Sequence, residues 1–283
     1  MAPGAAFPPR LLAALTRALK GTVPDDCARA VPLLEANVRK VLEARRLRED
    51  KERARPRRRA AVLLPLCTDG GVPSVLFTKR TELVSTHKGQ VRFGGTPSAL
   101  ERQSRPPLQR QPHSRPRSAQ KPKVSFPGGH IEPGETHRAC AVREMFEEVG
   151  IDKACAEVLG YCETVPAVTG TLVTPVVAVL QPDLAELRPF TLSDGEVDEV
   201  FSLPLAGIVS GELLEMRPYE TKKHQVRTKS GALPVFHGGP HEVWGLTAMI
   251  LHGFIENCLR PQLQEGDLAG VSGLGGEGTL EST

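Results

Sequence analysis

Three glutamates near the middle of the chain have the spacing of a metal site. Glu144, Glu147 and Glu148 occupy positions i, i+3 and i+4, so a helix would place their carboxylates on one face. Like charges at this spacing repel one another on a plain surface helix. A divalent cation reverses the sign, because Mg²⁺ and Mn²⁺ prefer carboxylate oxygens and also bind phosphate oxygens. The pattern indicates such a site, with a solvated charged helix face as the alternative.

Residues around these glutamates have the types needed to position them. A helix is predicted over residues 136–149, and Gly150 is expected to end it. A turn containing Gly128 and Gly129 precedes the helix, and glycine lets a backbone approach a ligand closely. Arg143 can pair with a carboxylate and hold its rotamer. The segment therefore predicts a glycine turn followed by an acidic helix.

The rest of the chain predicts strands and helices that mix without regular alternation. Strands are expected at residues 60–67, 75–78, 158–164, 171–180 and 197–203, a hairpin at 219–236, and further helices at 31–53 and 244–258. This mixture predicts the α+β class with a mixed sheet. The basic run at residues 53–59 is interpreted as a solvated helix end, with contact to an acidic ligand or membrane surface as the alternative.

The glycine turn and helix together resemble a known motif. The run is Gly129, five residues, Glu135, seven residues, Arg143-Glu144, an apolar residue, one further residue, Glu147-Glu148, one further residue, Gly150 and an apolar residue. This spacing is similar to the Nudix box without a departure. The resemblance implies a Nudix α/β/α sandwich around a mixed β-sheet. It also implies hydrolysis of a nucleoside diphosphate linked to another group, with Mg²⁺ or Mn²⁺ as cofactor.

The resemblance also implies roles for individual residues. Glu144, Glu147 and Glu148 would be metal ligands, and Glu147, Glu148 and Arg143 would be catalytic. Glu135 would support the loop and the helix start. Which carboxylate activates water differs among family members and stays open here.

An acidic stretch downstream offers a further candidate. Glu196 or Glu199, within residues 193–199, could add a metal ligand or a base. The alternative is a loop with solvated charges.

A second resemblance narrows the substrate. Residues 76–91, LFTKRTELVSTHKGQV, followed by SFPGG at 125–129, are similar to the signature of the coenzyme A subgroup of Nudix hydrolases. The similarity covers roughly residues 57–90 and 124–260. It implies hydrolysis of coenzyme A or acyl-coenzyme A to 3′,5′-ADP and 4′-phosphopantetheine. The implied substrate-binding residues are Arg80, His87, Lys88, Gly128 and Gly129.

Alternatives to this substrate stay open. NADH, a nucleotide sugar or an RNA cap would suit another Nudix hydrolase, and a catalytically silent Nudix-like binding module is a third interpretation. For coenzyme A, the 3′-phosphate could be met by Lys79, Arg80 or Lys88 through charge. The alternative is that these three residues are ordinary basic side chains at strand ends, where they face water.

Residues 91–123 interrupt the coenzyme A signature. They hold eight Lys/Arg, one acidic residue and six prolines without a hydrophobic period, which predicts a disordered insertion. Removing all 33 residues restores an uninterrupted match. We therefore interpret the block as translated intron, with a genuine regulatory loop as the alternative. The version without the block is expected to be more active or more stable.

The two ends of the chain are expected to extend beyond the Nudix domain, which we assign to residues 57–260. Residues 1–24 lack Asp and Glu, and their leucines fall near one helix face, as in a mitochondrial presequence or an ordinary N-terminal helix. We treat residues 1–56 as an extension and candidate transit peptide, and residues 261–283 as a disordered tail. A mitochondrial location is expected, with cytoplasmic or peroxisomal location as alternatives.

Composition bounds the class of protein. The 283 residues are 40% hydrophobic and 24% charged, which is ordinary for a globular chain. No apolar run reaches the ~20 residues of a membrane helix. Residues 91–123 carry a net charge of +7 and the other 250 residues −4, so no nucleic-acid surface is expected for the whole protein. Six scattered cysteines without a C-x-x-C pair predict buried thiols. The resemblance implies a small-molecule substrate as partner, coenzyme A or a related diphosphate.

Overall fold

A computed structural model of the protein describes residues 7–20, 58–81, 122–218 and 232–268. Several expectations lie outside these residues: the helix at 31–53, the substrate-binding candidates His87 and Lys88, the first arm of the hairpin at 219–229, and the tail beyond 268. Most of the interruption at 91–123 lies outside them as well.

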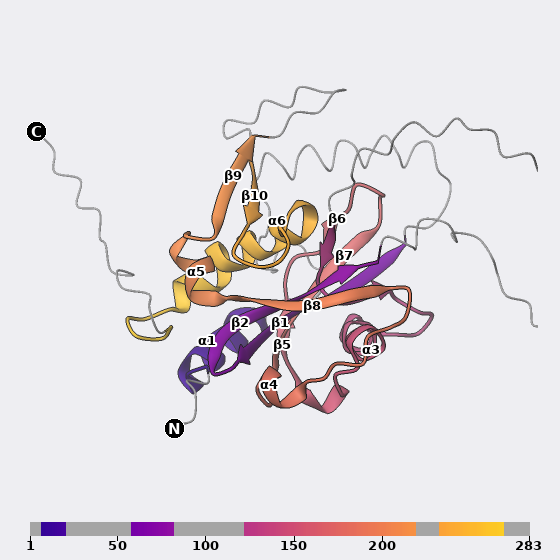
Figure 1. Ribbon diagram of the computed structural model, residues 1–283, viewed down its shortest axis with the longest axis horizontal. Helices are drawn as coiled ribbons and strands as arrows, with labels where there is room; N and C mark the ends of the chain where they lie inside the picture. Colours follow the sequence, from indigo (N-terminus) through magenta and orange to yellow (C-terminus); the bar gives the residue numbers. More distant parts are fainter. Residues whose placement is uncertain (1–6, 21–57, 82–121, 219–231, 269–283) are drawn as a thin grey trace, which may run out of the picture.

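A mixed β-sheet forms the centre of the fold (Figure 1). Its eight strands are β1 (Arg59–Asp69), β2 (Val72–Arg80), β3 (Lys123–Ser125), β4 (Gly128–His130), β5 (Ala156–Tyr161), β6 (Val165–Pro166), β7 (Leu172–Leu180) and β8 (Val197–Pro204). Strands β1 and β7 pair in parallel, whereas the other neighbours are antiparallel. The predicted α+β class with a mixed sheet is therefore confirmed.

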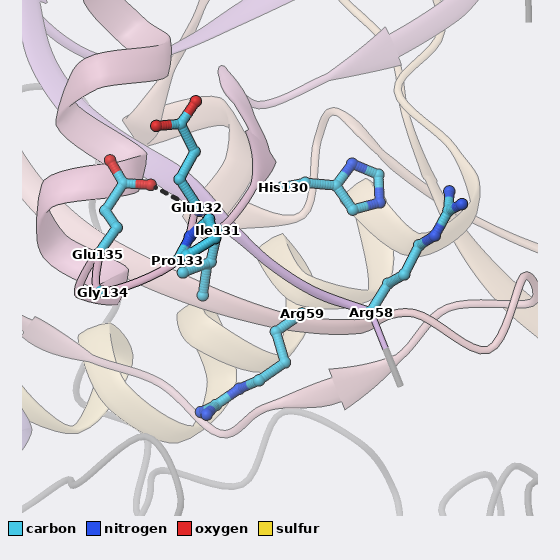
Figure 2. Close-up of a pocket in the computed structure, with 8 residues that line it drawn as sticks. All are labelled: Arg58, Arg59, His130, Ile131, Glu132, Pro133, Gly134 and Glu135. Atoms are coloured by element: carbon cyan, nitrogen blue, oxygen red, sulfur yellow. Dashed lines mark hydrogen bonds between the residues drawn. The ribbon is translucent and has the colours of Figure 1, made fainter. Parts of the chain in front are cut away.

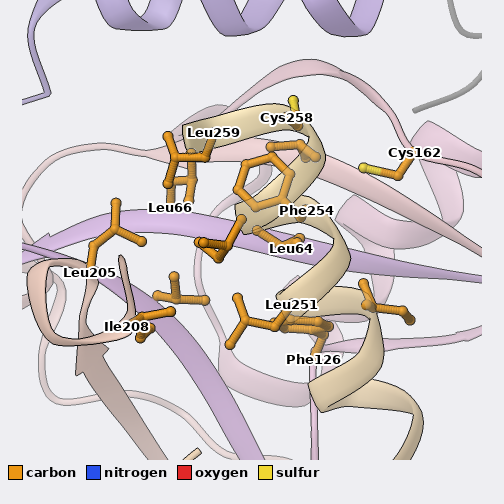
Figure 3. Packing of buried hydrophobic residues seen from close by; sticks show 14 of the residues in the cluster. Leu64, Leu66, Phe126, Cys162, Leu205, Ile208, Leu251, Phe254, Cys258 and Leu259 are labelled. Atoms are coloured by element: carbon orange, nitrogen blue, oxygen red, sulfur yellow. The ribbon is translucent and has the colours of Figure 1, made fainter. Parts of the chain in front are cut away.

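Helices cover both faces of this sheet. On one face, α3 (His137–Val149) packs against Ala61, Leu63 and Leu76. On the other face, α1 (Pro9–Lys20) and α6 (Gly245–Phe254) pack against Leu64 and Leu66, and Figure 3 shows the side chains of this second cluster. Odd- and even-numbered residues of β1 serve opposite faces because side chains alternate along a strand. The result is the expected α/β/α sandwich.

Smaller elements complete the fold. They are the short helices α4 (Leu184–Leu187) and α5 (Leu205–Ser210), the 3₁₀ turns η3 (Lys153–Cys155) and η5 (Arg260–Gln262), the π-helical turn η4 (Ile255–Leu259), and a two-stranded sheet of β9 (Leu214–Pro218) and β10 (Ala232–Phe236). The predicted final helix is thus α6 extended by η4. Among the described residues, no helix has the length and apolar character to cross a membrane.

Local chemistry explains the limits of α3. The Thr136 side chain accepts a hydrogen bond from the Ala139 amide, which caps the first turn. Gly150 has φ 78°, and its N–H donates to the Phe146 carbonyl, which closes the last turn. The predicted helix and its stop are therefore confirmed.

Two expected boundaries need correction. The interruption is expected to end at residue 123, but Lys123 begins β3, and the Pro122 carbonyl accepts a hydrogen bond from Trp244 Nε1 at 3.2 Å. The tail is expected from residue 261, but Asp267 and Leu268 are buried. In both places tertiary contacts order residues whose local composition predicts none.

Helix α1 is built into the core. Leu11, Leu15 and Leu19 are fully buried, and a Cβ at Gly160 of β5 would lie 2.5 Å from the Leu19 Cβ, so the two backbones meet closely. Arg10 forms an ion pair with the buried Asp267, which ties the helix to the end of the described chain. The leucine face that resembles a presequence is thus a packing face. These contacts favour the ordinary-helix interpretation.

Shortening a leucine in this face is expected to destabilise the protein. Leu15→Ala leaves a cavity between α1 and the sheet and should cost about 2–5 kcal/mol, or roughly 5–15 °C in melting temperature. Arg17→Ala, on the exposed side of the same helix, is the control and should melt like the wild type. Thermal unfolding followed by circular dichroism measures both. Equal melting of all three proteins would show that α1 is dispensable.

The cysteines that the structure describes are mostly buried thiols, as predicted. In the part of the chain that the structure describes, the five cysteines are free, and Cys67, Cys140, Cys162 and Cys258 are buried. Burial raises the pKa of the Cys258 thiol to about 12, which keeps it protonated and unreactive.

Candidate active site

Two glycines let the acidic helix approach the sheet. A Cβ at Gly129 would lie 2.2 Å from Glu144 Oε1, so only glycine leaves room for that carboxylate. A Cβ at Gly128 would lie 2.5 Å from the Ala61 carbonyl oxygen of the paired strand β1. The Gly128 amide also lowers the pKa of the Glu148 carboxyl. The glycine turn therefore joins the helix to the sheet by close contact.

Arg143 holds three carboxylates at once. Its Nε and Nη2 donate to the two oxygens of Glu135 at 2.9 and 3.0 Å. Its Nη1 donates to Glu144 Oε1 at 3.0 Å and to Glu147 Oε2 at 2.9 Å. These bonds lower the pKa of Glu135 to about 2, so this carboxyl stays ionised. Arg143 thus fixes the positions of two predicted metal ligands.

Glu148 is the buried member of the set. Only 1% of its surface is exposed, and its Oε1 lies 3.3 Å from Arg80 Nη1. Its Oε2 is buried and has no hydrogen-bond partner among the described residues. Burial raises the pKa of Glu148 to about 7, with Arg80 and the Gly128 amide opposing the rise. A buried, half-partnered carboxylate is costly unless a cation or proton compensates it.

The two downstream acidic candidates, Glu196 and Glu199, lie in different surroundings. Glu196 adds to the rise in pKa of both Glu144 and Glu148, so its charge acts on the box carboxylates. Glu199 instead pairs with His241 Nε2 at 2.7 Å. Burial is the largest cause of the raised Glu144 pKa. Of the two candidates, Glu196 is therefore the one associated with the site.

The donor set fits a divalent cation, although it is not a preassembled cage. Within the described residues, no three His, Cys, Asp or Glu side chains converge as ligands in the positions they occupy. Arg143 and Arg80 hold the three glutamates instead. The free, buried Glu148 Oε2 and the crowding of like charges both favour a bound cation with oxygen ligands. Glu144, Glu147 and Glu148 are the residues that could hold it.

The basic substrate-binding candidates that the structure describes already have carboxylate partners. Arg80 pairs with Glu148, and Lys79 pairs with Asp198 at 3.4 Å, so each already has a carboxylate partner. Residues Arg58 and Arg59 do not form a helix end: Arg59 begins β1, and both line a pocket. This pocket is not predicted from the sequence. The contiguous basic run beside a predicted strand is the signal that could have indicated it.

The pocket lies beside the glycine turn and has a volume of about 600 Å³ (Figure 2). It is lined by Arg58, Arg59, His130, Ile131, Glu132, Pro133, Gly134 and Glu135. The turn that leads into α3 forms one wall, and the start of β1 contributes the two arginines. Because Glu135 lines this pocket and is held by Arg143, the pocket adjoins the carboxylate network.

The two glycines are expected to respond differently to the same substitution. Gly129→Ala collides with the end of the flexible Glu144 side chain, so it should lower kcat about 10-fold or more and leave the melting temperature nearly unchanged. Gly128→Ala collides with backbone of β1, so it should lower the melting temperature. Steady-state kinetics and thermal unfolding of the pair test this. A stable Gly128→Ala protein would contradict the packing argument.

Comparison with known proteins gives consistent relatives. A family model described as NUDIX domain matches residues 107–223. The human protein named mitochondrial coenzyme A diphosphatase NUDT8 is 35% identical over 229 residues, which are 80% of this chain and 79% of that protein. Nudix hydrolase 3 of Caenorhabditis elegans is 28% identical over 74% of this chain and 76% of its own length. Nudix hydrolase NudL of Escherichia coli strain K12 is 36% identical over 69% of this chain and 79% of its own length.

Proposed function

Because the chain belongs to the Nudix hydrolase family, we propose that it is a diphosphatase acting on coenzyme A or acyl-coenzyme A. The products are 3′,5′-ADP and 4′-phosphopantetheine or its acyl form. The name of the human relative supports the substrate. The unpartnered buried oxygen of Glu148 beside the other box glutamates supports the chemistry, since hydrolysis of an anionic diphosphate needs compensating positive charge.

Nudix hydrolases generally need a divalent metal ion, and we propose Mg²⁺ or Mn²⁺ for this chain. Glu144, Glu147 and Glu148 would hold it, and a bound ion would neutralise diphosphate oxygens and activate water. Arg143 orients Glu144 and Glu147, and Glu135 keeps Arg143 in place. Gly128 and Gly129 let the box glutamates and β1 lie close to the turn, and their backbone is the candidate contact for the substrate's phosphates. Glu147 and Glu148 are the candidates for the base.

A substrate panel tests the proposal. The purified full-length protein is assayed with coenzyme A, acetyl-coenzyme A, NADH, a nucleotide sugar and capped RNA, each with Mg²⁺, with Mn²⁺ and with a chelator. The proposal expects the highest kcat/KM for the coenzyme A substrates, loss of turnover with chelator, and loss in Glu147→Gln. A preference for another diphosphate would reassign the substrate. No turnover of any substrate would indicate a binding module.

The proposed compartment is the mitochondrion. Two relatives, human and mouse, carry that location in their names. Immunofluorescence of the full-length chain with a C-terminal tag should overlap a matrix marker. A cytoplasmic or peroxisomal pattern would contradict the assignment.

The interruption also carries a proposal. The hydrolase domain begins at residue 57 and reaches residue 268, because Asp267 and Leu268 are buried. Residues 91–123 are translated intron that separates the two halves of the coenzyme A signature. Kinetics and melting of the chain with and without this block test the point, and transcript sequencing across the junction tests its origin. Equal rates and melting temperatures would favour a genuine loop.

A further inference from the structure

We propose that Arg58 and His130 bind the 3′-phosphate of coenzyme A in the pocket beside the glycine turn. The proposal deepens the proposed function and rests on it. Coenzyme A carries this phosphate on the ribose of its adenosine half, a few bonds from the diphosphate. A subsite for it must therefore adjoin the hydrolytic site without being part of it.

The other basic residues near the box are already paired. Arg80 lies 3.3 Å from Glu148, and Lys79 lies 3.4 Å from Asp198. Arg143 is shared among three glutamates. In contrast, within the described ranges neither Arg58 nor His130 has a carboxylate partner for its side chain. Their hydrogen-bond donors are thus available to a ligand.

The strand register places these two side chains on one face of the sheet. His130 is opposite Ala60 in the pairing of β4 with β1. Arg58 precedes Ala60 by two residues, and side chains two apart on an extended chain point to the same side. Figure 2 shows the His130 ring and the Arg58 guanidinium extending in the same direction, on the right of the view. Their donors can therefore converge on one group.

Negative charge in the pocket is kept apart from this pair. Glu135 is compensated by the two hydrogen bonds from Arg143. The carboxylates of Glu132 and Glu135 point to the side of the pocket away from His130 and Arg58, as Figure 2 shows. The end formed by Arg58 and His130 is accordingly the one that can accept an anion.

The chemistry suits a phosphate monoester. A guanidinium presents a planar pair of donors that matches two phosphate oxygens, and an imidazole N–H can donate to a third. The pocket and the carboxylate site share the turn: His130 supplies a side chain to the pocket, while its backbone oxygen accepts from Arg143 Nη2 at 3.3 Å. Arg58 and His130 lie on the face of the sheet that carries α1 and α6, whereas the box glutamates lie on α3 on the other face. Coenzyme A bound there would have to pass the shared turn to bring its diphosphate to those glutamates.

Comparing coenzyme A with dephospho-coenzyme A, which lacks only the 3′-phosphate, tests the proposal. In Arg58→Ala and in His130→Ala, kcat/KM for coenzyme A should fall about 10-fold or more, while kcat/KM for dephospho-coenzyme A stays within about two-fold of the wild type. Arg17→Ala on α1 makes the same charge change far from the pocket and should alter neither value. Equal losses for both substrates, or no loss for either, would overturn the assignment.

Binding of products separates this inference from the proposed function. Calorimetry of the full-length protein should detect tighter binding of 3′,5′-ADP than of 5′-AMP, and Arg58→Ala should abolish that difference. If the wild type hydrolyses coenzyme A but binds both nucleotides equally, the subsite is wrong and the function stands. If it hydrolyses no coenzyme A yet prefers 3′,5′-ADP in an Arg58-dependent manner, the subsite stands and the function is wrong.

Discussion

Glu148→Gln is expected to lower kcat by about 100-fold to 1,000-fold without unfolding the protein. The substitution keeps the size of the side chain but removes the charge that would help hold a divalent cation beside the diphosphate. Glu157→Gln, an exposed glutamate on β5, is the matched control and should retain wild-type rates. Initial rates at saturating Mn²⁺ and coenzyme A measure the effect. Wild-type turnover in Glu148→Gln would remove Glu148 from the machinery.

The pH dependence of stability in the wild type and in Glu148→Gln gives a second test, and the direction of the expected change follows from the Glu148 pKa. The pKa of Glu148 is raised from 4.5 to about 7 in the folded state, so the folded protein binds more protons than the unfolded chain between these values. The metal-free protein therefore loses stability as pH rises from about 4.5 to about 7. The neutral amide in Glu148→Gln lacks this penalty, and the variant should melt no lower than the wild type at pH 8 in chelator. A lower melting temperature would show that burial of the charge is not costly.

Arg80→Ala is expected to lower kcat about 10-fold to 100-fold by releasing Glu148. Arg80 is the charged partner of Glu148, and its positive charge lowers the Glu148 pKa. Loss of a residue that orients a metal ligand typically costs this much in metal affinity or activity. The Mn²⁺ concentration for half-maximal rate should rise, and the acidic limb of the pH–rate profile should move to higher pH. Arg80→Lys should recover part of both.

These readouts distinguish a positioning role from a substrate contact. If Arg80 only bound substrate, as its place in the coenzyme A signature implies, Arg80→Ala would raise KM for coenzyme A. The metal dependence and the pH profile would then stay as in the wild type. That outcome would contradict the structural assignment and restore the interpretation from sequence.

The acidic helix could be predicted from sequence because its determinants are local. Thr136 and Gly150 cap α3 within one turn of its ends, and helical geometry alone puts Glu144, Glu147 and Glu148 on one side. Short apolar runs bounded by turn residues likewise predicted most strands of the sheet. The box spacing identified the family because it spans a single turn and helix, where sequence separation and spatial separation coincide.

The environment of each glutamate was decided only by the tertiary structure. Glu148 and Arg80 are 68 residues apart in sequence, and Arg10 and Asp267 are 257 apart. No local pattern predicts which of three adjacent carboxylates is buried, or that a presequence-like helix packs into the core. Arg58 and His130 lie on the same face of the sheet only because β4 pairs with β1. Burial and pairing of charges depend on which elements the sheet brings together, so they could not be read along the chain.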